Sequence, residues 1–367
     1  MPMIQSSSCT PSPACGGRLG WGLWAAKILP PPQPSPAPRA REGALYACAI
    51  MAALVAGHAA AQEWKPSKNV EIVVNSGAGG AADRSARVVQ RLLGGVPGFS
   101  SITVVNKPGG AGTVAFTYVS QHAGDAHYFC TMGTSILTNE IVGTSKLSYR
   151  DLTPLNILMR EYVVAWVRAE SPIASAKEVI ARIRKDPSSL TFGFATAPGN
   201  QNHIVIGMLA KAAGVDPKAV KTVIFSSGGV GMTAALGGHV DVWVGTSGGA
   251  LQHQRTGKAR VLGVSAARRM EGGLETAPTF REQGIEAEYF AWRGFVAPKG
   301  LTAAQTAFWD QAFASIIKTD EWKKDLVVNA WAEDFTGAVE TRKRLDSEHE
   351  LLTERLIELG LVTRPGR

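Results

Sequence analysis

Short runs of β-branched residues alternate with helical stretches along the chain after Pro66. The first run, at 70–74, reads VEIVV and leads into the glycine-rich turn NSGAGGAAD. Residues 84–93 then carry apolar side chains at helical spacing. Repeated in this way, the pattern predicts an α/β fold with parallel sheets covered by helices on both faces. Further strands are expected at 102–105, 128–132, 163–167, 190–194, 220–225, 240–244 and 261–264, with helices at 176–185 and 203–213 among them.

The length of the chain favours two lobes. Of 367 residues, 306 (367 minus 61) follow residue 61, which is more than one doubly wound sheet usually uses. The last stretch, 302–361, is expected to be mostly helical, because Trp309, Phe313 and Ile316 give it one apolar face.

Residues 1–61 are interpreted as a leader. The apolar stretch 44–61 follows Arg39 and Arg41 and ends in three alanines before Gln62, as a secretory signal does. It is shorter and richer in alanine than a membrane span. We therefore expect cleavage before Gln62 and a periplasmic protein that does not span the membrane after signal removal.

Two further features of the leader leave alternatives open. The 38 residues before Arg39 are rich in proline and resemble neither a signal peptide nor a domain, which suggests a start codon assigned too early. Cys48 offers an alternative lipoprotein anchor, although Tyr46 is bulky where small residues are usual.

Charge and cysteine content exclude several classes of site. The net charge is +8, of which the first 61 residues hold +3 (four cations and one anion), and the remaining +5 contains no dense basic run. This distribution argues against a nucleic-acid partner. Cys130 is the single cysteine after the leader, so neither an internal disulfide nor a thiolate metal site is expected, and Cys130 is interpreted as a buried strand residue. No metal or cofactor is proposed.

Four segments combine a strand, small residues and a helix start: 75–83, 131–135, 195–203 and 226–231. Ligands of open α/β sheets bind at the carboxyl ends of the strands, where free N–H groups at helix N-termini attract anions. All four segments are poor in charge, which predicts a site for a small anion built from backbone amides and hydroxyls. The candidate ligand-binding residues are Ser76, Gly77, Ala78, Gly79, Asp83, Thr134, Ser135, Thr196, Gly199, Asn200, His203, Ser226, Ser227, Thr246 and Ser247.

Three of these residues have a second interpretation. Asp83 lies at a helix start, where a carboxylate caps free amides. His203 also opens a helix and either contacts the ligand or braces the loop before it. Ser247, in the sequence GTSGG, formally matches the nucleophile elbow of hydrolases and keeps an enzyme as an alternative.

Several motifs in consistent order carry a specific resemblance. They are Gly79-Gly80 with Asp83 and Ala86-Arg87, the segment 104–110 (VVNKPGG), Gly199 to His203, 236–241 (LGGHVD), 277–279 (APT), 292–294 (WRG) and 297–300 (APKG). From about 64 to 361 the chain resembles the periplasmic substrate-binding proteins of tripartite tricarboxylate transporters, often called the Bug family.

The resemblance implies a two-lobed periplasmic-binding-protein-like fold of type II, with two crossovers between the lobes. Lobe 1 would hold 64–163 with 289–367, and lobe 2 would hold 164–288. The implied function is capture of a small organic acid in the inter-lobe cleft, for delivery to the membrane permease subunits of the transporter. A sensor subunit for a membrane signalling protein and a periplasmic hydrolase remain alternatives. Ala81, Ala82, Ala195 and the pair 226–227 differ from the family's usual residues and leave the identity of the acid open.

Overall fold

The computed structural model describes residues 63–363, so the expectations for the signal peptide, the start codon and Cys48 lie outside the described residues. The strands are β1 (Val70–Val74), β2 (Ile102–Asn106), β3 (Tyr128–Met132), β4 (Leu152–Arg168), β5 (Thr191–Ala195), β6 (Lys221–Phe225), β7 (Val242–Thr246), β8 (Ala259–Val264), β9 (Phe290–Pro298) and β10 (Trp331–Thr336). The helices are α2 (Ala81–Leu93), α3 (Thr113–Ser120), α4 (Ser135–Ile141), α5 (Ala176–Lys185), α6 (Gln201–Ala212), α7 (Gly228–Leu236), α8 (Ser247–Arg255), α9 (Ala303–Ile316), α10 (Asp320–Val328) and α11 (Ala338–Glu358).

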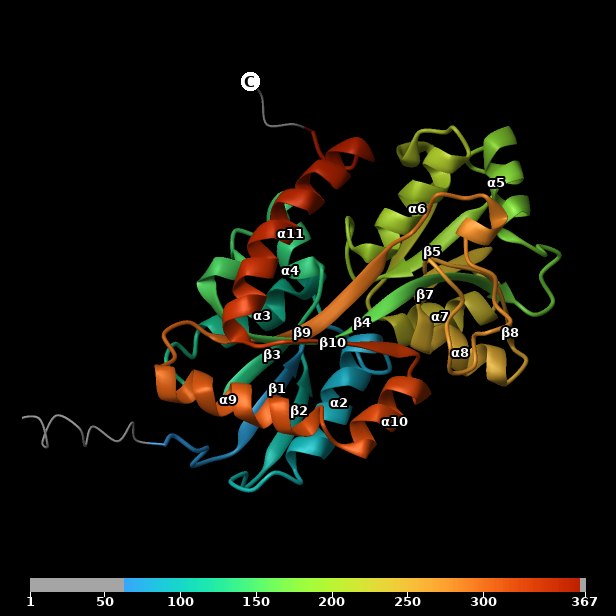
Figure 1. Ribbon diagram of the computed structural model, residues 1–367. Coiled ribbons are helices and arrows are strands. Elements are labelled where there is room, and N and C mark those ends of the chain that lie inside the picture. Colours follow the sequence, from blue (N-terminus) through green and yellow to red (C-terminus); the bar gives the residue numbers. More distant parts are fainter. Residues whose placement is uncertain (1–62, 364–367) are drawn as a thin grey trace, which may run out of the picture. The chain divides into compact units, whose positions relative to one another are not determined.

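The hydrogen-bonded strand order is β2-β1-β3-β9-β4-β7-β5-β6, with β8 and β10 also paired to β4. Helices cover both faces of the strands in each lobe (Figure 1). In the first lobe, α2, α9 and α10 lie on one face of β1–β3 and α3, α4 and α11 on the other. This arrangement confirms the expected α/β, two-lobed binding-protein fold.

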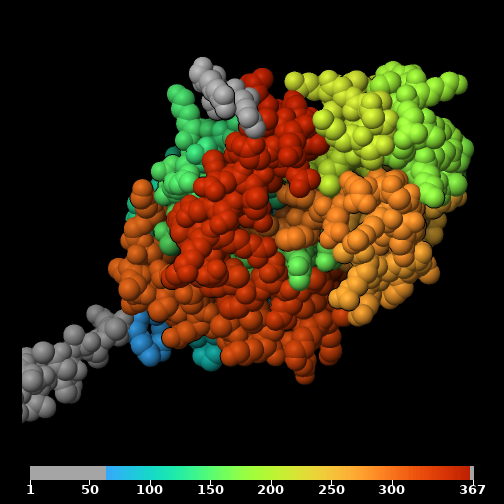
Figure 2. Space-filling model, turned by 45° about the horizontal axis from the view of Figure 1, so that its top comes forward, coloured from blue at the N-terminus to red at the C-terminus, as the bar shows by residue number. Residues whose placement is uncertain are grey.

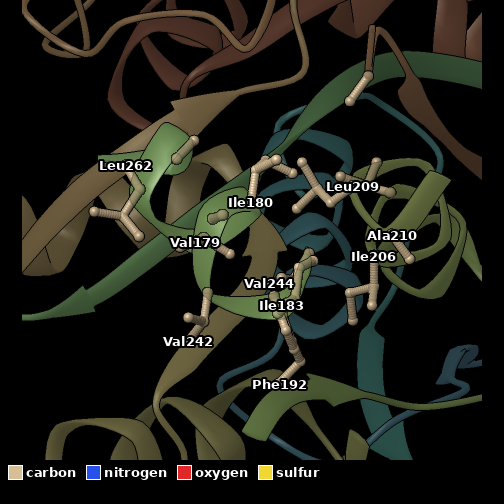
Figure 3. Close-up of a cluster of buried hydrophobic side chains, with 14 of the residues drawn as sticks. Val179, Ile180, Ile183, Phe192, Ile206, Leu209, Ala210, Val242, Val244 and Leu262 are labelled. Carbon is tan, nitrogen blue, oxygen red and sulfur yellow. The ribbon is translucent and has the colours of Figure 1, made fainter. Parts of the chain in front are cut away.

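The second lobe is built around β5, β6 and β7, with α5 and α6 on one face and α7 and α8 on the other (Figure 1). The side chains of α5 and α6 point onto the strands (Figure 3). Ile180 and Ile183 of α5 and Leu209 of α6 are buried in one cluster with Phe192 of β5. Burial of each such side chain contributes roughly 1.5–3 kcal/mol, so this apolar layer fixes the loops at the ends of β5 to β7.

Strand β4 joins the lobes. Its residues 152–162 pair with β9, and residues 163–168 pair with β7 and β8. The expectation of parallel sheets is therefore only partly right: β1–β3 and β5–β7 pair in parallel, but the pairs that involve β4 and β9 are antiparallel. The reason is that β4 and β9 are the two connections between lobes and run in opposite directions.

Other predictions from the sequence can be compared with the described residues. The expected strand at 163–167 is the second half of the much longer β4, and β9 and β10 were not expected. Cys130 is buried in β3, as predicted. The C-terminal residues form a broad part of the surface (Figure 2).

The lobe boundaries at 163/164 and 288/289 stay a prediction. Across 63–363, no helix has both the length and the apolar character needed to cross a membrane.

Candidate functional site

Six strand-to-helix loops, those after β1, β2, β3, β5, β6 and β7, surround one cavity of about 70 Å³. At about 10–15 Å³ per ordered water, the cavity has room for several waters or a short organic molecule. Its lining residues are Asn75, Ser76, Gly80, Ala81, Ala82, Arg84, Ala111, Gly133, Thr134, Ser135, Ala195, Thr196, Gln201, Asn202, Gly228, Met232, Trp243, Gly245, Thr246, Gly249 and Arg293.

The Trp243 ring forms an apolar part of the wall between two glycines. A Cβ atom at Gly231 would come within 2.1 Å of this ring, and one at Gly245 within 2.4 Å. Larger residues at either position would displace the indole. Glycine is therefore required here for space rather than for backbone conformation.

Side-chain hydrogen bonds hold the loop after β1. The Asn75 N–H donates to Thr131 Oγ1 on β3 at 3.1 Å, and Asn106 Nδ2 at the end of β2 donates to the Ser76 carbonyl at 3.0 Å. The loop then turns at Gly79, whose φ of +75° favours glycine. These contacts fix Asn75 and Ser76 at the rim of the cavity.

Asp83 completes this support. Its Oδ2 accepts from the Gly79 N–H at 3.0 Å and from Arg87 Nε at 3.0 Å, and its Oδ1 accepts from Asn106 Nδ2 at 2.9 Å. Burial alone would raise the pKa of Asp83, but hydrogen bonds from Arg87, Asn106 and Gly79 outweigh burial and lower it. The carboxylate therefore holds the loop before α2 and does not cap an amide of the helix itself, in contrast to the capping interpretation.

Three of the helices at the cavity begin without a side-chain cap. The N-cap residues Gly80 of α2, Thr134 of α4 and Thr246 of α8 make no capping hydrogen bond. The first N–H groups of a helix have no partner within the helix. In contrast, Asn200 caps α6 and Ser227 caps α7. The uncapped starts of α2 and α8, both on the cavity wall, therefore supply free donors for an anion.

The loops of the two lobes touch at glycines. A Cβ atom at Gly229 of α7 would lie 3.0 Å from the Ala78 carbonyl oxygen, and one at Gly77 would lie 3.1 Å from Ser227 Cβ. Gly228 and Gly80 face each other in the same contact, since a Cβ at Gly80 would lie 3.5 Å from Gly228 N. Small residues thus allow the backbones to meet beside the cavity.

The structure places the predicted ligand-binding residues in two groups. Those that line the cavity are Ser76, Thr134, Ser135, Thr196 and Thr246. Those that do not line it are Gly77, Ala78, Gly79, Asp83, Gly199, Asn200, His203, Ser226, Ser227 and Ser247. Ser226 lies beside a neighbouring pocket with Thr196. Most of the second group support the loops that the first group belongs to.

His203 braces the loop before α6. Its Nδ1 accepts from the Gly199 N–H at 3.0 Å, and its ring stacks on Phe194 with centroids 5.0 Å apart. Burial lowers its pKa to about 4. The imidazole is therefore neutral, as its role as an acceptor for Gly199 requires.

Ser247 is buried, and its hydroxyl donates to the Ala330 carbonyl at 2.8 Å. Within the described part of the chain, no hydrogen bond joins Ser247 to a histidine or an acid. This is not the arrangement of an activated nucleophile. In residues 63–363, no group of three or more His, Cys, Asp or Glu side chains is placed to hold a metal ion.

Sequence reasoning missed the charged part of the cavity. Arg84 of α2 and Arg293 of β9 line it, although an arginine-free cradle was expected. Asn202 was also missed: its Oδ1 is buried and has no hydrogen-bond partner in the described residues. The sequence placed Arg84 next to the candidate residue Asp83, but this was only a weak indication that Arg84 lines the cavity. Adjacent helical residues project about 100° apart, and the sequence did not show which of the two faces the cavity.

Solved structures with this fold include binding proteins. BugD superposes with a TM-score of 0.75 at 20% identity, over 81% of this chain and 99% of that chain. MatC from Rhodopseudomonas palustris, solved with bound malate, superposes with a TM-score of 0.67 at 24% identity, over 80% of this chain and 98% of that chain. A second R. palustris protein, solved with adipate, gives a TM-score of 0.72 at 21% identity, over 80% and 98%.

Comparison of sequences gives relatives of one family. A UPF0065 protein of Bordetella bronchiseptica is 28% identical over 228 residues, which is 61% of this chain and 65% of that protein, just under two thirds of its length. A UPF0065 protein of Cupriavidus necator is 27% identical over 78% of this chain and 86% of that protein. Residues 86–358, which are most of the chain, match the family described as the tripartite tricarboxylate transporter family receptor, TctC. The chain belongs to this receptor family.

Proposed function

We propose that the protein is an extracytoplasmic receptor that captures a small carboxylate in the cavity between its lobes and delivers it to a tripartite tricarboxylate transporter. The observation that carries this proposal is the composition of the cavity wall. The uncapped starts of α2 and α8, the hydroxyl residues Ser76, Thr134, Ser135, Thr196 and Thr246, and two arginines all line one cavity. Such donors stabilise an anion.

The relatives support the class of ligand. MatC was solved with malate and another R. palustris protein with adipate, and both are small carboxylates. Their identity to this chain is 24% and 21%, so they support the class and not the particular acid. BugD is a periplasmic binding protein, and Ser247 of this chain donates to the Ala330 carbonyl instead of pairing with a base. Receptor function is accordingly preferred over hydrolysis.

Export and partners belong to the same proposal. The leader 1–61 would direct the chain to the periplasm, and the membrane permease subunits would receive the loaded receptor. The contact between Gly229 and the loop at Ala78 would form or tighten as the lobes enclose the acid. The joint surface of the two lobes would then report occupancy to the permease.

A panel of acids tests the proposal. Purified protein, freed of ligand retained from the cell, is unfolded by heat with malate, succinate, adipate, citrate, glutamate and benzoate in turn. A ligand that binds only the folded state raises its stability, by about 2.7 kcal/mol at a hundredfold excess over Kd. We expect one class of acid to raise Tm sharply and to be recovered unchanged.

Two outcomes would contradict the proposal. Absence of a shift with every acid, in protein shown to be folded and ligand-free, would remove the carboxylate receptor. Conversion of a bound acid to product would replace it with an enzyme. Calorimetric titration of the best acid, with its neutral amide as control, separates recognition of charge from non-specific stabilisation.

A further inference from the structure

Arg84 lines the cavity, and two of its hydrogen-bond donors have no partner in the described residues. Its Nη1 donates to the Gly79 carbonyl at 3.2 Å, which anchors the guanidinium to the loop after β1. Its Nε and Nη2 atoms are buried and have no hydrogen-bond partner in the described residues. Buried donors of a charged group are costly when unpaired. These two atoms form one edge of the guanidinium fork, which suits a carboxylate with two oxygens.

The other arginine of the cavity is already paired. Arg293 Nε donates to Glu161 Oε2 at 2.5 Å, and Trp331 Nε1 donates to Glu161 Oε1 at 2.7 Å. Glu161 is fully buried on β4, where both oxygens are occupied. The charge of Arg293 is therefore balanced within the protein.

The charge balance around Arg84 is different. Asp83, the nearest carboxylate in the sequence, is engaged by Arg87, Asn106 and Gly79. Burial lowers the pKa of Arg84, while the charge of Glu161 acts in the opposite direction. Arginine nevertheless stays protonated in proteins. Arg84 and Arg293 are the charged residues that line the cavity, and Glu161 balances Arg293, so one positive charge remains uncompensated.

We propose that Arg84 determines specificity by binding a second acid group of the ligand through Nε and Nη2, while Glu161 holds Arg293 beside it as a balanced pair. This inference rests on the proposed receptor function and assigns a residue to its charge preference. The first acid group would take the backbone donors of α2 and α8. The cavity would then favour a diacid over the same molecule with one acid group neutralised.

Matched ligands and variants test the assignment. Binding of succinate, malate, glutarate and adipate, and of the monoamide of each, is measured by calorimetry on the wild-type protein, Arg84→Gln, Arg84→Lys and Arg91→Gln. Arg91 lies on the same helix and pairs with Asp325 of α10, away from the cavity. In the wild-type protein, we expect the preferred diacid to bind about tenfold to a hundredfold more tightly than its monoamide.

Arg84→Gln should lose most of this preference by weakening diacid binding, with little change for the monoamide. Arg84→Lys should keep part of it, because it keeps the charge but not the fork. Arg91→Gln should behave as the wild type. Ligand-free Arg84→Gln should melt close to the wild type, because the loss of the Nη1 hydrogen bond to the Gly79 carbonyl is offset by removal of two buried donors without partners.

The outcomes separate the two proposals. Equal preference for the diacid in Arg84→Gln and wild type would overturn the role of Arg84 and leave the receptor intact. A large fall in ligand-free Tm, with diacid and monoamide weakened alike, would also overturn it and assign Arg84 a structural role. Failure of the wild-type protein to bind any acid would overturn the receptor itself, and with it this inference.

Discussion

Several polar side chains that the sequence singles out bond to the backbone and do not line the cavity. Asp83 binds the Gly79 amide, Asn200 and Ser227 cap helices, and His203 accepts from Gly199. Each fixes a loop whose neighbouring residues line the cavity. At this scale, the candidate site combines positioned amides and hydroxyls with the arginines Arg84 and Arg293, and its geometry depends on the supporting residues as well as on the lining ones.

The neutral state of His203 predicts a dependence of stability on pH. Its pKa is about 4 in the folded protein and 6.5 in an unfolded chain. The unfolded state therefore binds more protons between these values, and the free energy of unfolding falls as pH drops from 6.5 towards 4, by up to about 3 kcal/mol. Urea unfolding at several pH values measures the slope.

His203→Asn is the matched variant, because the amide oxygen of asparagine replaces Nδ1 as an acceptor for the Gly199 N–H. Other groups that titrate in this range are common to both proteins. The wild type should therefore lose more stability than the variant between pH 6.5 and 4. Parallel pH profiles for the two would show that His203 titrates normally.

At the scale of elements, the N-terminus of α7 is one of the places where the two lobes meet. Gly229 is helical and has ordinary backbone angles, yet a Cβ there would lie 3.0 Å from the Ala78 carbonyl oxygen and 3.4 Å from Gly79. A backbone oxygen moves less easily than a side chain. The glycine is therefore explained by the approach of the other lobe and not by the needs of the helix.

Gly229→Ala should separate the effect of residue 229 on helix stability from its effect on the contact between the lobes. Alanine favours a helix over glycine by about 1 kcal/mol, so the ligand-free protein should be as stable as the wild type or more stable. Ligand affinity should fall, because the lobes no longer meet without displacement. Gly228→Ala, whose Cβ would lie at an ordinary 3.6 Å from Gly80 Cα, should have a smaller effect. Calorimetric titration and thermal unfolding of both variants measure the difference, and unchanged affinity in Gly229→Ala would contradict it.

The sequence predicts individual helices and strands better than it predicts which strands pair with each other. β1, β3 and α5 were expected at the residues where they occur, because each is a short run with a clear period. β9 and β10 were missed: β9 contains Gly294 and Pro298, and β10 carries Glu333 and Asp334. Long-range pairing decides both strands.

For the candidate site too, the sequence predicts local segments better than the direction in which side chains point. Four of the loops at the cavity were predicted, those at 75–83, 131–135, 195–203 and 226–231, because small residues after a strand mark a strand-to-helix turn. The loop after β2 was not predicted, and the loop after β7 was represented only by Thr246 and Ser247. The inward direction of Arg84 and Arg293, and the pairing of Arg293 with Glu161, depend on helix rotation and strand register. Local sequence does not carry that information.

At the scale of the molecule, the shared strand β4 couples the stability of the lobes. Its first half contributes to the sheet with β9 and its second half to the sheet with β7 and β8. Loss of order in one lobe would leave the remainder of β4 without half of its support. The lobes should therefore unfold together.

Phe192→Ala tests this coupling. Phe192 is fully buried in the second lobe, and its truncation should cost about 3–5 kcal/mol. We expect one transition at lower Tm, with equal calorimetric and van't Hoff enthalpies, and equal loss of hydrogen-exchange protection in β1 and β5. Val339→Ala, at an exposed position, is the control. Two transitions, or a loss confined to β5, would show that the lobes unfold independently.

Strands β4 and β9 pair side by side over residues 152–162, and their register shifts between Pro154 and Asn156 and again between Ile157 and Met159. A two-stranded ribbon of this kind bends and twists at its bulges. Its hydrogen bonds resist stretching of the strands and sliding of one strand along the other. A connection of this kind would favour rotation of the lobes about one short axis. In the receptor that we propose, capture of an acid would then be converted into an angle, and a permease that gauges this angle would distinguish a loaded receptor from an empty one without touching the cargo.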